Sequence, residues 1–120
     1  MSSASTNRAF YCKAERLLRG YQFRRVYEKG RRYNSPLFTF FAKKNEINVS
    51  RLGITATKKI GNAVERNRCK RILREIFRHH KRILPHPFDL VFNVKKAMIE
   101  ASYLEVEREF LRLCSFLQKS

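Results

Sequence analysis

Hydrophobic side chains gather in three short runs that predict β-strands. The first run, 37–42, is rich in phenylalanine, and the second, 49–57, alternates apolar with polar or small residues, as a strand with one buried face does. The third run, 88–94, is apolar at nearly every position, so we expect it to occupy the centre of a sheet. Asn45 and Glu46 suit a hairpin connection between the first two runs, which we therefore expect to be antiparallel neighbours.

A short helix is predicted just before the first strand, within residues 22–29. Phe23, Val26 and Tyr27 fall at positions i, i+3 and i+4, so they share one face of that helix. We expect Gly30 to end the helix in the left-handed backbone conformation that glycine adopts without strain.

Two longer helices begin with capping signals. Asn62 with Glu65, and Ser102 with Glu105, have the spacing of a capping box, in which two side chains satisfy each other's free backbone N–H groups. The prolines in 85–87 end the first of these helices. Its predicted apolar side consists of Cys69, Ile72, Leu73, Ile76, Phe77 and His80. The apolar stripe of the last helix consists of Val106, Phe110, Leu113, Cys114 and Leu117.

The order of these elements predicts an α+β fold, a small mixed β-sheet with helices packed on it, in the order α-β-β(-β)-α-β-α. The helix after Asn62 would be the crossover between two strands. Residues 31–36 are expected to form turns. We expect residues 1–15 to be a flexible basic N-terminal segment and residues 16–120 to be a single domain, which suits a chain of 120 residues.

The charge of the chain narrows the choice of partner. It has 27 Lys and Arg against 10 Asp and Glu, a formal net charge of +17, which is costly in a small domain because like charges repel. A polyanionic partner relieves that repulsion, and nucleic acid is the first candidate. Cysteine is present at Cys12, Cys69 and Cys114 without a CxxC pair, which favours ordinary thiols in a reducing compartment, and no apolar run is long enough to span a membrane. We therefore expect a cytoplasmic protein.

The helix after Asn62 concentrates this charge on one arc. A helical wheel places Arg68 apart from the arc, near Glu75, so we expect Arg68 to make an ion pair or a backbone contact instead. Lys58 and Lys59 stand just before the helix, where free N–H groups and the helix dipole also attract anions. The arc consists of Arg66, Asn67, Lys70, Arg71, Arg74, Arg78 and Lys81.

Aromatic residues supply a second candidate surface. Strand alternation places Phe38 and Phe40 on one face and Phe41 on the other, so one set fills the core. The other set joins Phe23 and Tyr27 as a platform on which unpaired bases stack, unless these rings also belong to the core.

Catalytic groups are sparse. His79, His80 and His86 are the only histidines, and we find no acid partner for them in the sequence. Asp89, the only aspartate, suits a turn at the end of a strand. No paired carboxylates, HExxH motif or phosphate-binding loop is present, so we predict no catalytic residue and no metal ligand in the protein.

Three segments together resemble the bacterial ribonuclease P protein subunit family. Residues 58–71 read KKIGNAVERNRCKR, residues 51–54 read RLGI, and residues 23–30 read FRRVYEKG. The similarity extends over about residues 16–117, and the Arg-Asn-Arg motif in this setting is highly specific.

The resemblance implies an accessory subunit of a ribonucleoprotein endoribonuclease that removes the 5′ leader of precursor tRNA. Its partners would be ribonuclease P RNA and precursor tRNA, with no membrane and no small-molecule substrate. The RNA subunit would carry the active site and bind most of the catalytic Mg²⁺. The residues implied in binding the RNA subunit are Lys58, Lys59, Arg66, Asn67, Arg68, Lys70, Arg71 and Arg74. Those implied in binding the leader are Phe23, Tyr27 and Phe41.

Three other functions remain open on the residues alone. A ribosomal protein shares the charge, the size and the α+β pattern, and pull-down of one catalytic RNA rather than ribosomal subunits distinguishes the two. A protein nuclease that acts without RNA is disfavoured by the lack of paired acids. A DNA-binding protein fits the charge but is disfavoured by the motif.

Overall fold

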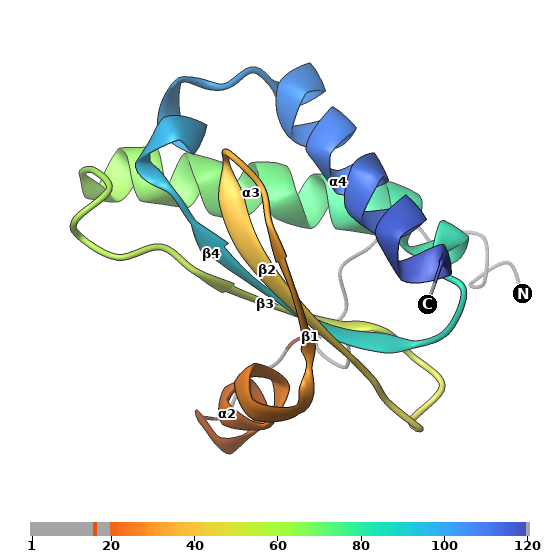
Figure 1. The fold of residues 1–120 in the computed structure, drawn as a ribbon. Helices are drawn as coiled ribbons and strands as arrows, with labels where there is room; N and C mark the ends of the chain where they lie inside the picture. Colours follow the sequence, from red (N-terminus) through yellow and green to blue (C-terminus); the bar gives the residue numbers. More distant parts are fainter. Residues whose placement is uncertain (1–15, 17–19, 120) are drawn as a thin grey trace, which may run out of the picture.

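The computed structural model describes Arg16 and residues 20–119, so the segment predicted at residues 1–15 lies outside the described residues. Helices and strands follow in the order α-β-β-β-α-β-α, which confirms the predicted fold class (Figure 1). The helices are α2 (Gly20–Lys29), α3 (Ala63–His80) and α4 (Tyr103–Gln118), with short 3-10 turns η2 (Lys81–Ile83) and η3 (Lys96–Glu100). The strands are β1 (Arg31–Asn34), β2 (Phe38–Lys44), β3 (Arg51–Thr55) and β4 (Phe88–Val94).

The four strands form one mixed sheet in the order β1-β2-β4-β3. β4 pairs antiparallel with β2 and parallel with β3, so α3 is the crossover between two parallel strands, as predicted. The prediction that 37–42 and 49–57 are antiparallel neighbours is wrong, because β4 lies between them. β4 is buried at six of its seven positions, and the central place covers both of its edges.

Turns were predicted at 31–36, but residues 31–34 form the edge strand β1, paired with β2 from Arg31 opposite Ala42 to Asn34 opposite Thr39, and only Ser35 and Pro36 lie outside it. Three of its four residues are exposed, so β1 carries no hydrophobic pattern that would mark it as a strand. Tyr33 is the exception, and its ring packs against Phe116 of α4 with the ring centres 5.0 Å apart.

Gly30 ends α2, but not in the left-handed conformation that the sequence suggested, since its φ is not positive. Close packing accounts for the glycine instead. A Cβ atom at Gly30 would lie 2.5 Å from the Val26 carbonyl oxygen and 2.9 Å from that of Ala42. Any side chain at this position would therefore push α2 away from β2.

The two faces of the sheet differ in what covers them. α3 and α4 lie against one face, where they bury Phe38 and Phe40 completely, as strand alternation predicted (Figure 1). α2 lies against the other face, where Val26 packs on Val91 and the ring of Phe41 is half-buried. All five residues of the predicted α4 stripe are buried.

Both predicted capping boxes are confirmed. The side chain of Asn62 accepts from the Glu65 N–H at 2.8 Å, and the Asn62 N–H donates to Glu65 at 2.9 Å. Ser102 and Glu105 make the same pair of bonds at 3.2 and 2.8 Å. The Asn62–Glu65 box satisfies backbone N–H groups in the first turn of α3, the helix that carries the basic arc.

Candidate nucleic-acid interface

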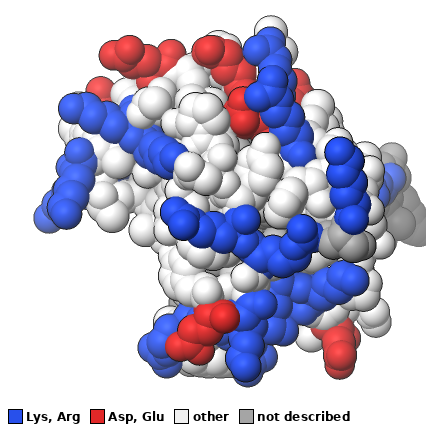
Figure 2. All heavy atoms as spheres, in the orientation of Figure 1, with Lys and Arg blue, Asp and Glu red and all other residues white. Residues whose placement is uncertain are grey.

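The basic arc of α3 lies on the side of the helix that turns away from the core. Cys69, Leu73, Ile76 and Phe77 are buried beneath the helix, whereas Arg71 is exposed. Lys and Arg side chains are spread over much of the face seen in Figure 2, and acidic side chains form smaller groups at its upper and lower margins. Exposed on the arc are Asn67, Arg71 and Arg74, while Arg66, Lys70, Arg78 and Lys81 are half-buried.

Arg68 leaves this arc and binds backbone, as the helical wheel predicted. Its guanidinium donates to the carbonyl oxygen of Ile99 at 3.1 Å and to that of Ala101 at 3.4 Å. Both carbonyls belong to the connection between β4 and α4, so Arg68 ties that connection to α3.

Lys58 and Lys59 share a hollow of about 270 Å³ with Lys96, a residue that no motif in the sequence marks. Gly61 permits the close packing beside it, because a Cβ there would lie 2.7 Å from Ile99 Cδ1. Lys96 comes from η3, 37 positions after Lys59 in the chain, and the parallel pairing of β3 with β4 brings the ends of both strands together. In the sequence, the only feature that pointed to Lys96 was the Lys95-Lys96 pair directly after a predicted strand.

The predicted aromatic residues come together on the other face of the sheet. The rings of Tyr27 and Phe41 meet edge to face with their centres 4.9 Å apart, and Phe23 packs beside them against Val26 and Val91. The Tyr27 hydroxyl donates to Asn93 Oδ1 at 2.9 Å, which fixes the ring over β4. We call Phe23, Tyr27 and Phe41 the aromatic platform.

His80 and His86 make contacts between elements of the fold. His80 has an acid partner that the sequence did not reveal, because its Nε2 lies 2.7 Å from Glu107 of α4. The His80 ring also lies 6.2 Å from the ring of Phe110, so this pair joins α3 to α4. His86 Nε2 contacts the Asn45 carbonyl oxygen at 3.2 Å, and His79 is exposed.

Asp89 was expected in a turn, but it is the second residue of β4 and is buried. Arg51 and Asn45 both bind its carboxylate. A buried carboxylate in a strand is held only when cations and donors surround it, and those donors come from parts of the chain that are distant in sequence.

The described residues do not favour a metal site, a reactive thiol or a membrane span. No three His, Cys, Asp or Glu side chains among them lie close enough together to hold a metal ion. Burial raises the pKa of the Cys69 and Cys114 thiols, so neither is activated as a nucleophile. Within the same part of the chain, no helix has the length and apolar character needed to cross a membrane.

Comparisons with known proteins agree with one another. The family model described as Ribonuclease P matches residues 12–118. The ribonuclease P protein component of Natranaerobius thermophilus is 38% identical over 97 residues, which cover 81% of this chain and 84% of that protein. The solved structure of the Staphylococcus aureus RNase P protein is 31% identical with a TM-score of 0.78, covering 87% of this chain and 95% of that one. The RNase P protein from Thermotoga maritima is 32% identical with a TM-score of 0.76, covering 88% and 97%.

Proposed function

Because this chain belongs to the ribonuclease P protein family, we propose that it binds the catalytic RNA of ribonuclease P and the 5′ leader of precursor tRNA. As the protein subunit of that ribonucleoprotein, it assists endonucleolytic removal of the leader, which leaves the mature 5′ end of tRNA. The observation that carries this proposal is the basic arc of α3, which lies beside the lysines of the preceding loop and away from the aromatic platform.

The RNA subunit binds to α3 and to the loop before it. Cationic side chains neutralise RNA phosphates and release counterions, and several such contacts on one rigid helix fix the orientation of the complex. The residues assigned to this contact are Lys58, Lys59, Arg66, Asn67, Lys70, Arg71 and Arg74. Arg68 supports it from behind, since its guanidinium holds the carbonyls of Ile99 and Ala101.

The leader binds to the aromatic platform. Phe23, Tyr27 and Phe41 present ring surfaces between α2 and the sheet, and rings of this kind stack on unpaired bases with little regard for sequence. Tyr27 is 38% exposed, which leaves part of its ring accessible to a base. Because leaders differ in sequence, stacking suits a subunit that serves many precursors.

Bond cleavage belongs to the RNA subunit, which also binds most of the Mg²⁺ that the reaction requires. The protein contributes binding energy and cationic charge. Contact with leader and catalytic RNA at once makes the second contact intramolecular, so two modest interactions give one tight complex. The added positive charge lowers the repulsion between the two RNAs, and so lowers the Mg²⁺ concentration that substrate binding needs. We place this activity in the cytoplasm and in the single domain formed by residues 16–120.

A reconstituted cleavage assay tests the proposal. Precursor tRNA with a leader, and a matched precursor without one, are given to the cognate RNA subunit with and without the protein. We expect the protein to improve both the binding and the cleavage of the leader-bearing precursor more than it improves those of the leaderless precursor. Equal effects on both substrates contradict leader binding. Cleavage by the protein without RNA contradicts the assignment of bond cleavage to the RNA subunit.

A further inference from the structure

A second hollow lies on the same face of the sheet as the aromatic platform, between α2 and the loop that follows β2. It has a volume of about 380 Å³ and holds four cationic side chains against two acidic ones. We call it the upstream pocket. Its lining consists of Arg25, Lys43, Lys44, Asn45, Glu46, Ile47, Arg51 and Asp89.

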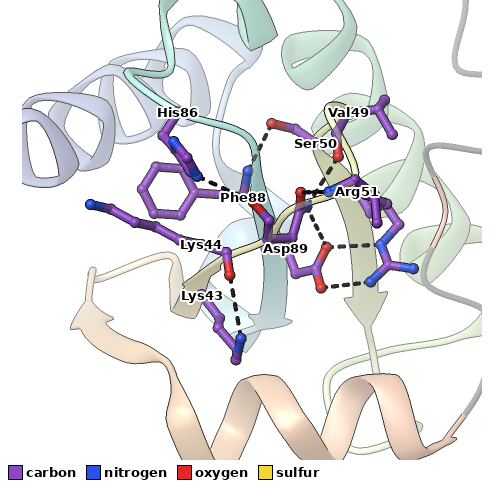
Figure 3. Close-up of polar contacts among 10 residues, drawn as sticks. Lys43, Lys44, Val49, Ser50, Arg51, His86, Phe88 and Asp89 are labelled. Carbon is purple, nitrogen blue, oxygen red and sulfur yellow. Dashed lines mark hydrogen bonds and ion pairs between the residues drawn. The ribbon is translucent and has the colours of Figure 1, made fainter.

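The floor of the upstream pocket is a closed polar network (Figure 3). Arg51 donates to both carboxylate oxygens of Asp89, from Nε at 2.8 Å and from Nη2 at 2.7 Å. Asn45 Nδ2 donates to the same carboxylate at 2.8 Å and to the Val49 carbonyl oxygen at 3.0 Å. Asp89 is therefore neutralised within the floor, and its charge does not offset the cations above it.

The same network shapes the loop that forms one wall. The Asn45 N–H donates to the Pro87 carbonyl oxygen at 3.0 Å, and its side chain accepts from the Ile47 N–H at 3.1 Å. Asn48 turns the chain back toward β3 with a φ of 67°, which asparagine tolerates better than most residues. A wall held by this many bonds does not need to be ordered when a ligand binds.

Three cations remain available above this floor. Among the described residues, no carboxylate forms an ion pair with Arg25, Lys43 or Lys44. Lys43 Nζ donates to the Lys44 carbonyl oxygen at 3.3 Å, which leaves its charge uncompensated. Glu46 is exposed at the rim. The pocket thus gathers like charges at one point, and an anion relieves their repulsion.

The position of the pocket identifies the anion. Phe41 and Lys43 are two residues apart on β2, so both side chains point to the α2 face, about 7 Å apart along the strand. Arg51 begins β3, whereas Lys58 and Lys59 follow its end, so the pocket lies at the far end of the strand from the contacts assigned to the RNA subunit. A single strand that leaves the RNA subunit and crosses the platform reaches the pocket next.

We propose that the upstream pocket binds a backbone phosphate of the precursor tRNA leader, on the 5′ side of the nucleotides held by the aromatic platform. This rests on the proposed function, because it requires the leader to cross the platform. Arg25 from α2 and Lys43 and Lys44 from the end of β2 supply the charge. The Arg51–Asp89–Asn45 network holds the floor and the loop that follows Lys44. Because of this contact, the affinity of the holoenzyme for precursor tRNA depends on how far the leader extends beyond the aromatic platform.

A leader-length series tests the assignment. Precursors with leaders shortened one nucleotide at a time are bound to the reconstituted holoenzyme. The wild-type protein should show a step in affinity at the length that first reaches the pocket. The pocket variant, Arg25→Gln with Lys43→Gln, should lose that step and keep its affinity for shorter leaders. For long leaders, its slope of log K against log salt should be shallower by about 0.7 for each phosphate that the protein no longer neutralises. The control, Arg108→Gln on α4 with Lys119→Gln directly after this helix, removes equal charge and should keep the step.

One neutral phosphate identifies the contact directly. A methylphosphonate placed at the step position should weaken binding to the wild-type holoenzyme and cause no further loss in the pocket variant, because both changes remove the same interaction. Additive losses overturn the proposal. So does a pocket variant that binds the RNA subunit alone more weakly, since the phosphate then belongs to that RNA. A wild-type protein indifferent to any leader contradicts the proposed function itself, whereas leader binding without a pocket-dependent step contradicts only the upstream pocket.

Discussion

Arg51 and Asp89 form a two-pronged ion pair across the parallel strands β3 and β4, at 2.7 and 2.8 Å. Only 5% of the Asp89 side chain and 18% of the Arg51 side chain is exposed, so each charge depends on the other for compensation. The pair explains how a sheet buries a carboxylate in its most apolar strand. It also connects stability to the upstream pocket, because the same carboxylate holds the loop through Asn45.

Asp89→Asn should lower the free energy of unfolding by about 3 kcal/mol, because it leaves the Arg51 guanidinium partly buried without its counter-ion. Urea unfolding followed by circular dichroism measures the change. The matched control is Arg112→Gln, which breaks the pair with Glu109 at 3.2 Å. Since 61% of the Arg112 side chain is exposed, its loss should cost less than about 1 kcal/mol. Equal losses in the two variants contradict the structural role of Asp89.

Arg68→Gln should act on stability more than on RNA affinity. The substitution removes the bonds to the Ile99 and Ala101 carbonyls and should lower the free energy of unfolding by about 1 kcal/mol. Arg71→Gln, on the exposed arc of the same helix, is the comparison and should leave stability unchanged while it weakens binding. Unfolding and RNA-binding titrations of both variants show whether Arg68 contributes to stability or to RNA affinity. A large loss of affinity in Arg68→Gln at full stability places Arg68 in the RNA contact instead.

Arg66→Ala combined with Arg71→Ala should keep the fold and weaken binding to ribonuclease P RNA. Because this variant neutralises two fewer phosphates, its slope of log K against log salt should be shallower by about 1.4 to 1.8, with the lower figure for single strands and the higher for duplex. Titrations at several salt concentrations give the slope, and circular dichroism confirms the fold. An unchanged slope in a folded variant contradicts the assignment of the basic arc.

Phe41→Ala should weaken binding of leader-bearing precursor about tenfold, because one stacked base contributes about 1–3 kcal/mol. Affinity for the leaderless precursor should stay the same, which separates lost stacking from general damage to the sheet. Tyr27→Phe is the matched control, since it keeps the ring and removes only the bond to Asn93. Equal weakening for both precursors shows that Phe41 supports the fold and not the leader.

Stability at alkaline pH should depend on Cys114. Burial raises the pKa of its thiol to about 12 from a usual 9.0, so the folded protein holds this proton more tightly than the unfolded chain does. The resulting stabilisation is complete below pH 9 and declines as the pH rises from there toward 12. Cys114→Ala should therefore show a shallower fall in the free energy of unfolding over this range than the wild type. Parallel curves for the two proteins contradict the prediction.

Local rules predicted most elements of this fold. The capping boxes at Asn62 and Ser102, the strand alternation around Phe40 and the position of Arg68 on the helical wheel all depend on neighbours within a few residues. Each was confirmed. The aromatic platform could be assembled because its members lie on one helix and the next long strand.

The errors have a common physical origin in pairing between distant segments. β1 is a strand because its backbone bonds to β2, while its exposed side chains give no pattern. Asn45 and Glu46 suggested a hairpin, yet insertion of β4 decides the neighbours of β2. The Asp89 network, the His80–Glu107 pair and the meeting of Lys96 with Lys59 all join residues that no local rule connects.

The insertion of β4 between β2 and β3 also bears on folding, because this central strand is the last of the four in the chain. α2, β1, β2, β3 and α3 all precede β4 in the chain, so β2 and β3 have no shared neighbour until β4 pairs with both. A chain that ends before residue 88 therefore lacks the strand that joins β3 to β2 and β1, and its sheet cannot form as one unit.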